Sequence, residues 1–240
     1  MKKRISLLAL SLLAGSALAQ DQVLFNGKDL TGWEGNPALW SVKDGVIHGE
    51  TQADPANPKK SSLHHNTFLV LKDATPGDFE IHAKFRITSE WGNSGIQYRS
   101  KLETAGQDGP IVSGYQADME SGKTYTGILY EEKGRGILAQ RGQQVVVKAD
   151  PADPKKTLKE VTGSVGDSKE IQEAIHITDW NEYVVIAKGN HLEQFINGKK
   201  TIDVTDEDPR GAKDGIIALQ MHAGPPMVVE FKDITLKSLK

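Results

Sequence analysis

Phe79-Glu80-Ile81-His82-Ala83-Lys84-Phe85-Arg86-Ile87 alternates apolar and polar residues at every position. Successive side chains of a β-strand point to opposite faces, so this alternation predicts a strand with one face in a hydrophobic core and the other toward water. Residues 183–187, 192–196 and 215–221 are rich in apolar residues and are also typical of strands. The chain is therefore expected to consist mainly of β-strands.

Tight turns are indicated between several of these strands. Asn197-Gly198 separates two apolar pairs, and Asp44-Gly45 precedes Val46-Ile47. Asn, Asp and Gly tolerate the positive φ angles that short hairpin turns require. Many short strands joined by such turns predict an all-β fold, a jelly-roll sandwich of two antiparallel sheets.

One segment interrupts this pattern. Residues 149–178 are rich in Pro, Asp, Lys and Gly, and residues 168–174 within them form the only stretch that favours a helix. We interpret this segment as a surface insertion with one short helix. Residues 20–240 are accordingly expected to form a single domain.

The N-terminus has the features of an export signal. Lys2, Lys3 and Arg4 precede an apolar run, and Ala17-Leu18-Ala19 is a cleavage motif, so residues 1–19 are predicted to be a signal peptide. The apolar run is too short to span a bilayer. We expect a mature protein in the periplasm or outside the cell, with no membrane partner.

Composition excludes several functions. The chain has no cysteine, which excludes disulfides, thiolate metal sites and a cysteine nucleophile. Its formal net charge is −3, without a cluster of basic residues, which argues against nucleic acid as a partner.

Three short stretches repeat one polar pattern: Gln97-Tyr98-Arg99, Gln116-Ala117-Asp118 and Gln220-Met221-His222. Each places a glutamine two residues before an ionisable group, and residues i and i+2 of a strand share a face. If the three strands are neighbours, one sheet face carries amides, a cation, a carboxylate and an imidazole. Such a face is suited to bind a ligand rich in hydroxyl groups.

A series of motifs resembles the 3-keto-disaccharide hydrolase domain family, whose fold is a concanavalin A-like jelly roll. The resemblance covers about residues 23–239 and rests on the order of these motifs: Leu24-Phe25-Asn26-Gly27-Lys28-Asp29-Leu30-Thr31-Gly32-Trp33, Asp78-Phe79-Glu80-Ile81, Asn93-Ser94-Gly95-Ile96-Gln97-Tyr98-Arg99-Ser100, Gly114-Tyr115-Gln116-Ala117-Asp118, Trp180-Asn181-Glu182, Asn197-Gly198, Gly215 through His222, and Phe231-Lys232-Asp233-Ile234.

The resemblance implies an enzyme that cleaves 3-keto-glycosides, with a small carbohydrate as its partner. A ketone at C3 of a sugar acidifies the C2 hydrogen, so a base can remove this proton, the enolate can expel the C1 substituent, and water can add back. This chemistry needs a base, a group that stabilises the enolate, and ligands for hydroxyl groups. We expect Asp118 and His222 to transfer protons and Arg99 to stabilise the anion.

The candidate sugar contacts are more numerous. Gln97, Gln116 and Gln220 are expected to bind hydroxyl groups, and Trp91 is expected to stack on a sugar ring. Further candidates, at the rim of the same cleft, are Tyr115, Tyr130, Glu131 and Arg135.

Other uses of the same residues remain open. Asp118 is equally suited to a structural ion pair with Arg99, and His222 to a hydrogen bond with a backbone group of its own turn. A second function that fits the fold is a carbohydrate-binding module without catalysis.

One further alternative has weaker support, and the chain departs from the family pattern at the same strand. The spacing Gln116-x-Asp118-x-Glu120 matches that of retaining glucanases, but an amide stands where their nucleophile would be, which disfavours this mechanism. The family form, as the resemblance has it, carries Tyr-Glu-x-Gln where this chain has Tyr115-Gln116-Ala117-Asp118, so the carboxylate lies two residues later.

No metal or cofactor is assigned. Asp118 and His222 are acceptable ligands for zinc or manganese, and Asp118 with Glu131 for calcium, but no H-x-H or comparable spacing accompanies them. The glycosidic linkage, the aglycone and the oligomeric state do not follow from the sequence.

Overall fold

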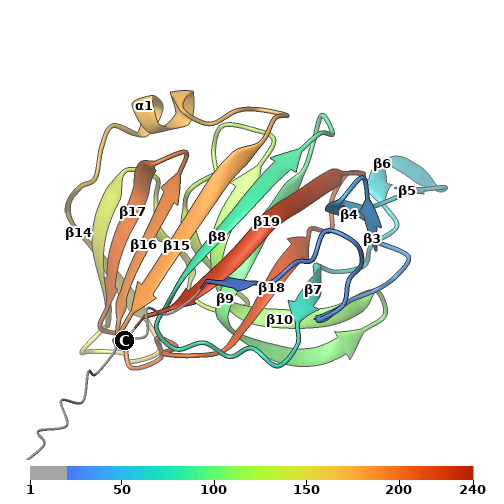
Figure 1. The fold of residues 1–240 in the computed structure, drawn as a ribbon. Coiled ribbons are helices and arrows are strands. Elements are labelled where there is room, and N and C mark those ends of the chain that lie inside the picture. The colour runs from blue at the N-terminus through green and yellow to red at the C-terminus, as the bar shows by residue number, and fades with distance from the viewer. Residues whose placement is uncertain (1–20, 240) are drawn as a thin grey trace, which may run out of the picture.

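The structure is a computed structural model and describes residues 21–239. Two large sheets face each other as a sandwich, and Figure 1 views it with the larger sheet in front. The larger sheet has ten strands. Nine of them lie in the order β14 (Thr157–Ser164), β13 (Gln143–Ala149), β17 (Lys199–Asp206), β16 (His191–Ile196), β15 (Asn181–Lys188), β8 (Phe79–Ile87), β19 (Val228–Ser238), β4 (Val46–Glu50) and β3 (Trp40–Lys43). The tenth, β1 (Gln22–Val23), pairs with β19.

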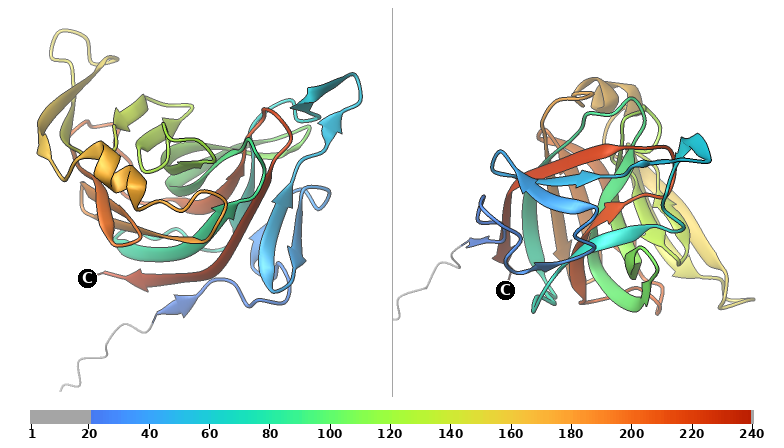
Figure 2. Two further views of the ribbon diagram at one scale, coloured as in Figure 1. Left: turned by 90° about the horizontal axis from the view of Figure 1, so that it is seen from above. Right: turned by 90° about the vertical axis from the view of Figure 1, so that its right-hand side faces the viewer.

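The second sheet has seven strands. Their order is β12 (Gly136–Ala139), β11 (Leu129–Glu132), β10 (Gly109–Glu120), β9 (Asn93–Gly106), β18 (Ile216–Met221), β7 (Thr67–Leu71) and β2 (Trp33–Glu34). A separate hairpin joins β5 (Ala53–Asp54) and β6 (Asn57–Ser61). In Figure 2 this hairpin and the β13–β14 hairpin project at opposite ends of the sandwich.

The predicted all-β sandwich is confirmed, and its central strands follow the alternation in the sequence. In β8 the buried and half-buried residues alternate along the whole strand. Asn197 and Gly198 have φ angles of 48° and 77°, and they connect β16 to β17 by the expected tight turn. Asp44 and Gly45 do the same between β3 and β4.

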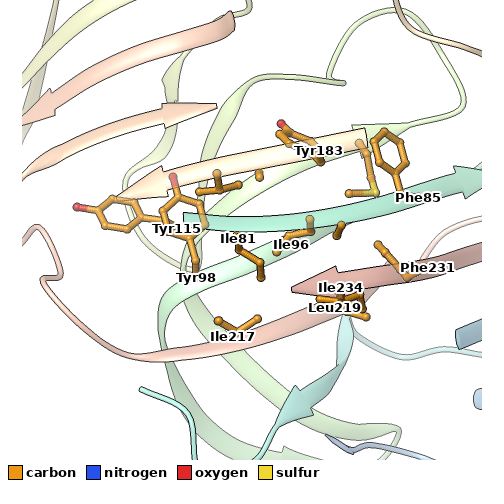
Figure 3. Close-up of a cluster of buried hydrophobic side chains, with 14 of the residues drawn as sticks. Ile81, Phe85, Ile96, Tyr98, Tyr115, Tyr183, Ile217, Leu219, Phe231 and Ile234 are labelled. Carbon is orange, nitrogen blue, oxygen red and sulfur yellow. The ribbon is translucent and has the colours of Figure 1, made fainter. Parts of the chain in front are cut away.

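The hydrophobic core lies between the two sheets. Figure 3 shows buried side chains from both, among them Ile81, Phe85 and Tyr183 from the larger sheet and Ile96 and Leu219 from the smaller. The core positions of β8 and β15 are fully or almost fully buried, which is the burial that the alternating pattern requires.

Two features differ from the expected pattern. The sheets are antiparallel except for one parallel pair, β13 with β17, because β14, α1, β15 and β16 intervene before the chain returns beside β13. The segment 149–178 does contain the short helix α1 (Ser168–Glu173), capped by Asp167, but its middle part, Thr157–Ser164, forms strand β14 at the edge of the larger sheet.

A buried polar network joins the two sheets at one end. Arg135, between β11 and β12, donates to Glu131 Oε1 at 2.6 Å and to Asp206 Oδ2 at 2.7 Å. Asp206 ends β17 of the larger sheet and also accepts a hydrogen bond from Tyr115 of β10. Because the guanidinium is only 5% exposed, both carboxylates depend on it for their counter-charge.

Two further expectations concern export and membrane association. The predicted signal peptide, residues 1–19, lies outside the described residues. Within the described part, no helix has the length and apolar character needed to cross a membrane.

Arg135→Met should lower the free energy of unfolding by about 3–5 kcal/mol, because it leaves two carboxylates buried without their cation. Urea denaturation measures this change. Lys148→Met is the control: it removes an exposed ion pair with Glu160 and should cost less than about 1 kcal/mol. Equal effects of the two substitutions would show that the network does not join the sheets.

Candidate functional site

The three glutamine triplets lie on neighbouring strands. β10, β9 and β18 are adjacent in the smaller sheet, and Gln116 pairs with Gln97 across the β10–β9 ladder. The side-chain amides of these two residues are in contact at 2.7 Å, and Gln116 Nε2 lies 3.4 Å from Gln220 Oε1. One face of the sheet, opposite the hydrophobic core, therefore carries a chain of three amides, as the i, i+2 spacing predicts.

Asp118 is held by two amide groups of this face. Gln116 Nε2 donates to its Oδ2 at 3.0 Å, and Asn93 Nδ2 donates to its Oδ1 at 3.2 Å. Residue 95, opposite Asp118 on β9, is glycine, and a Cβ there would lie 2.4 Å from Gln116 Cγ. Gly95 thus leaves the space in which the Gln116 side chain lies.

A cavity of about 300 Å³ opens over these amides, and we call it the amide cavity. Its volume is at the lower end of the range for small-molecule sites. It is lined by Asn66, Asn93, Gln116, Asp118, Tyr125, Ile128, Tyr130, Glu132, Ile137, Gln220 and His222.

Burial changes the acidity of the carboxyl groups in this cavity. Asp118 is 5% exposed, and burial raises its pKa well above the usual range, with the charges of Glu120 and Glu132 acting in the same direction. Burial also raises the pKa of Glu132, whose carboxylate accepts from Asn66 Nδ2 at 3.3 Å. Both groups therefore hold a proton more tightly than carboxyl groups in water.

The pKa of the His222 imidazole changes in the opposite direction. Burial lowers the pKa of His222, so its neutral, proton-accepting form is favoured at neutral pH. Its buried Nδ1 has no hydrogen-bond partner among the described residues, while the adjacent backbone of Ala223 acts on the pKa of His222 in the opposite direction to burial. Trp91 packs against the ring edge-on, with centroids 5.7 Å apart.

Trp91 and Gln97 do not line the amide cavity. Trp91 borders a neighbouring depression together with His222, Asn93 and Tyr125. Gln97 is fully buried beneath Gln116, so it positions that amide and does not face a ligand.

Arg99 does not join Asp118 and His222, and the expectation that it shares their face is wrong. Between Ser113 and Tyr115 the β10–β9 register shifts, so that Arg99 and Ser100 together oppose Gly114. This bulge interrupts the alternation, and Arg99 has a φ of 44°.

The Arg99 side chain is instead enclosed at one end of the sandwich. It is 0% exposed and donates to Asp78 Oδ1 at 3.0 Å and to the carbonyls of Gly77 and Gly189 at 2.8 and 2.7 Å. The alternative of an ion pair between Arg99 and Asp118 is therefore also wrong.

Three rim candidates belong to the polar network between the sheets. Glu131 and Arg135 bind each other, and the Tyr115 hydroxyl donates to Asp206, so none of them faces the amide cavity. Tyr130 does line it. The acidic residue of this strand that lines the cavity is Glu132 and not the chosen candidate Glu131. The same i, i+2 rule that pairs Gln116 with Asp118 pairs Tyr130 with Glu132 and excludes Glu131.

The positions of Glu120 and Glu131 do not support the glucanase mechanism or the calcium site. Glu120 Oε1 accepts from the backbone N–H of Tyr125 at 2.7 Å in the loop after β10, and Glu120 does not line the amide cavity. The calcium pairing of Asp118 with Glu131 is wrong, because Glu131 turns toward Arg135.

One group of three potential metal ligands occurs among residues 21–239. It comprises His191, Glu193 and Asp203, on β16 and β17 of the larger sheet. The ammonium group of Lys200 already bridges Glu193 and Asp203, so this cluster is an ion-pair network in the structure.

Solved structures share this fold. A provisionally assigned glycosyl hydrolase from Parabacteroides distasonis has a TM-score of 0.53 at 20% identity, covering 92% of this chain and 94% of its own. A Bacillus subtilis protein with a galectin-like fold has a TM-score of 0.52 at 11% identity, with 91% and 94% covered. The carbohydrate-binding module CBM66 of Bacillus subtilis has a TM-score of 0.50 at 13% identity, with 86% and 96% covered.

The fold is thus a galectin-like, concanavalin A-like sandwich, shared with structures described as a glycosyl hydrolase and as a carbohydrate-binding module. The sequence profile of the 3-keto-alpha-glucoside-1,2-lyase-like domain matches residues 20–237, so the chain belongs to this family, as its motifs indicate. Comparison with curated proteins found no match.

Asp118→Asn should change the pH dependence of stability. A carboxyl group with a raised pKa in the folded state stabilises that state below its ordinary pKa, near about 4, and the contribution is lost as pH rises toward the folded pKa. Asparagine does not titrate. The melting temperature of the variant relative to wild type should therefore rise between pH 4 and pH 8.

Differential scanning calorimetry across this pH range measures the effect. Glu173→Gln, which removes an exposed carboxylate on α1, serves as the control and should shift the melting temperature equally at every pH. A pH-independent difference for Asp118→Asn would mean that Asp118 ionises like a solvated carboxyl group.

Proposed function

We propose that this protein is a lyase that cleaves 3-keto-glucosides by elimination across C1 and C2, with His222 as the base and Asp118 as the acid. The observation that carries the proposal is the opposed pKa shifts of these two residues in one amide-lined cavity. Groups whose environments separate their pKa values in this way are suited to divide acid and base roles. Membership of the 3-keto-alpha-glucoside-1,2-lyase-like family supports the substrate class.

The reaction begins with the C2 proton of the sugar. The neutral imidazole of His222 accepts this proton, and the electron pair of the C2–H bond moves toward C3 to give an enolate at the ketone oxygen. The enolate then reforms the C3 carbonyl, a double bond forms between C1 and C2, and the C1–O bond breaks. The Asp118 carboxyl donates its proton to the departing oxygen, and later addition of water to the double bond gives the 3-keto sugar.

Neutral donors must stabilise the enolate in this mechanism. Among the described residues that line the amide cavity, none is lysine or arginine. The hydroxyl groups of Tyr125 and Tyr130 can donate hydrogen bonds here, and so can the side-chain amides of Asn66 and Gln220 through the N–H that is not directed at Glu132. Burial raises the pKa of Tyr130, which keeps its proton in place. The role first expected of Arg99 thus passes to these groups.

A carbohydrate-binding module is the second candidate function. The likeness of the fold to CBM66 favours it, and the amide cavity suits hydroxyl ligands in either case. The raised pKa of Asp118 favours the enzyme, because a charged carboxylate would be the better sugar ligand.

We also propose that the protein acts outside the cytoplasm. The basic N-terminus, the apolar run and the Ala17-Leu18-Ala19 motif support export followed by cleavage.

A comparison of leaving groups tests the acid and base assignments. Wild type should release glucose from 3-keto-trehalose and 4-nitrophenol from 4-nitrophenyl 3-keto-α-glucoside. It should not cleave the corresponding unoxidised glycosides. His222→Gln should lower kcat on both substrates by about 10²–10⁴-fold. Asp118→Asn should lower it mainly on 3-keto-trehalose, because nitrophenolate leaves without a proton.

Isotope effects and a matched variant complete the test. Deuterium at C2 should slow the wild-type reaction by a primary isotope effect, which direct hydrolysis at C1 would not show. His82→Gln, at a partly exposed histidine on β8 of the larger sheet, should leave both rates unchanged. Sugar binding without turnover of either oxidised substrate would favour the binding module instead.

A further inference from the structure

A second cavity, of about 630 Å³, lies beside the amide cavity, and we call it the basic cavity. Its lining includes Lys101, Lys133, Arg135, Lys155, Lys159 and Arg210. These residues come from β9, the β11–β12 turn, the β13–β14 hairpin and the loop after β17, so separate segments converge on one space. Such a concentration of cations stands out in a chain with a net charge of −3.

The arginines of this cavity already have ion-pair partners. Arg99, which also lines the cavity, binds Asp78 as described above. Arg135 binds Glu131 and Asp206, as described above, and Arg210 donates to Asp208 Oδ1 at 2.9 Å and to the carbonyl of Lys155 at 2.7 Å. They form the frame of the cavity and hold the β13–β14 hairpin in place.

The lysines, in contrast, have few partners that would neutralise their ammonium groups. The ammonium groups of Lys133 and Lys155 have no hydrogen-bond or ion-pair partner among the described residues, and Lys101 reaches Glu103 only at 3.5 Å. Lys159 donates to the carbonyl of Arg135 at 2.9 Å. Burial, with the like charge of Arg135, lowers the pKa of Lys159, and the charge of Glu131, which also lines this cavity, acts in the opposite direction.

Glu132 connects the two cavities, because it lines both. Its carboxyl group faces Gln220 and Asn66 on the side of the amide cavity. A substrate whose sugar ring occupies the small amide cavity must extend beyond it, and the larger basic cavity is the adjoining space.

We propose that the basic cavity binds an anionic oxygen group, a carboxylate or a sulfate ester, on the leaving-group part of the substrate. This inference rests on the proposed function and narrows its substrates to 3-keto-glucosides that carry an acidic sugar or another acidic aglycone. Lysine ammonium groups bind such oxyanions by charge-assisted hydrogen bonds, and the large cavity accommodates the aglycone.

Paired chromogenic substrates test this inference. Wild type should have a kcat/KM at least about tenfold higher for 3-carboxy-4-nitrophenyl 3-keto-α-glucoside than for the 4-nitrophenyl compound, since a single charged hydrogen bond is worth a factor of this size. Added salt should reduce the ratio. In the double variant Lys133→Gln/Lys155→Gln the ratio should fall toward one, while the control Lys169→Gln/Lys188→Gln, at exposed lysines elsewhere, keeps it.

Equal kcat/KM values for the two substrates in wild type would overturn the inference and leave the proposed function standing. Cleavage of neither substrate would instead contradict the proposed function.

Calorimetric titration separates the binding question from catalysis. Glucuronate and glucose 6-sulfate should each bind wild type more tightly than glucose, and the preference between them distinguishes carboxylate from sulfate. The loss of this preference in Lys133→Gln/Lys155→Gln supports the inference. Binding of inorganic sulfate as tight as that of glucose 6-sulfate would overturn the assignment to an acidic sugar.

Discussion

The hydrogen bond from Gln116 to Asp118 is the interaction on which the site depends. A carboxyl group removed from water needs polar partners, and here amides supply them without supplying charge. Neutral donors hold the Asp118 side chain in place, yet they do not offset the effect of burial on its pKa, which stays raised. Gly95 makes this geometry possible, because only a residue without a Cβ leaves room for the glutamine.

The smaller sheet presents two chemically different faces from the same strands. Tyr98 and Tyr115 stack in the core with ring centroids 5.6 Å apart, whereas Gln97 and Gln116 meet on the opposite face. Period-2 alternation therefore places the core and the site on opposite faces of the same strands, and a one-residue slip in register would exchange the two faces. The bulge opposite Gly114 ends this arrangement, because beyond it the side chains change sides and Arg99 turns into the end of the sandwich.

Regular alternation made the fold and half of the site predictable from sequence. Strand β8, the Asn197-Gly198 turn and the common face of Gln116, Asp118 and Gln220 follow from local patterns. Arg99 could not be placed, since a bulge depends on the register of two strands and not on either sequence alone. The parallel pairing of β13 with β17 likewise depends on the route of the chain through space. Glu132 was within reach of the same rule and was passed over in favour of Glu131.

The separation of charge between the two cavities follows from the demands of the proposed chemistry. A fixed cation beside Asp118 would favour its ionised form and lower its pKa, and the proton needed by a leaving group would be lost. Positive charge that attracts an acidic substrate must therefore lie at a distance from Asp118, and here it lies beyond Glu132. Glu132 lines both cavities and lies between the lysines and the acid, and its charge acts on Asp118 in the direction that raises the pKa of this acid. Substrate attraction and proton donation are thus placed in adjoining spaces, and neither weakens the other.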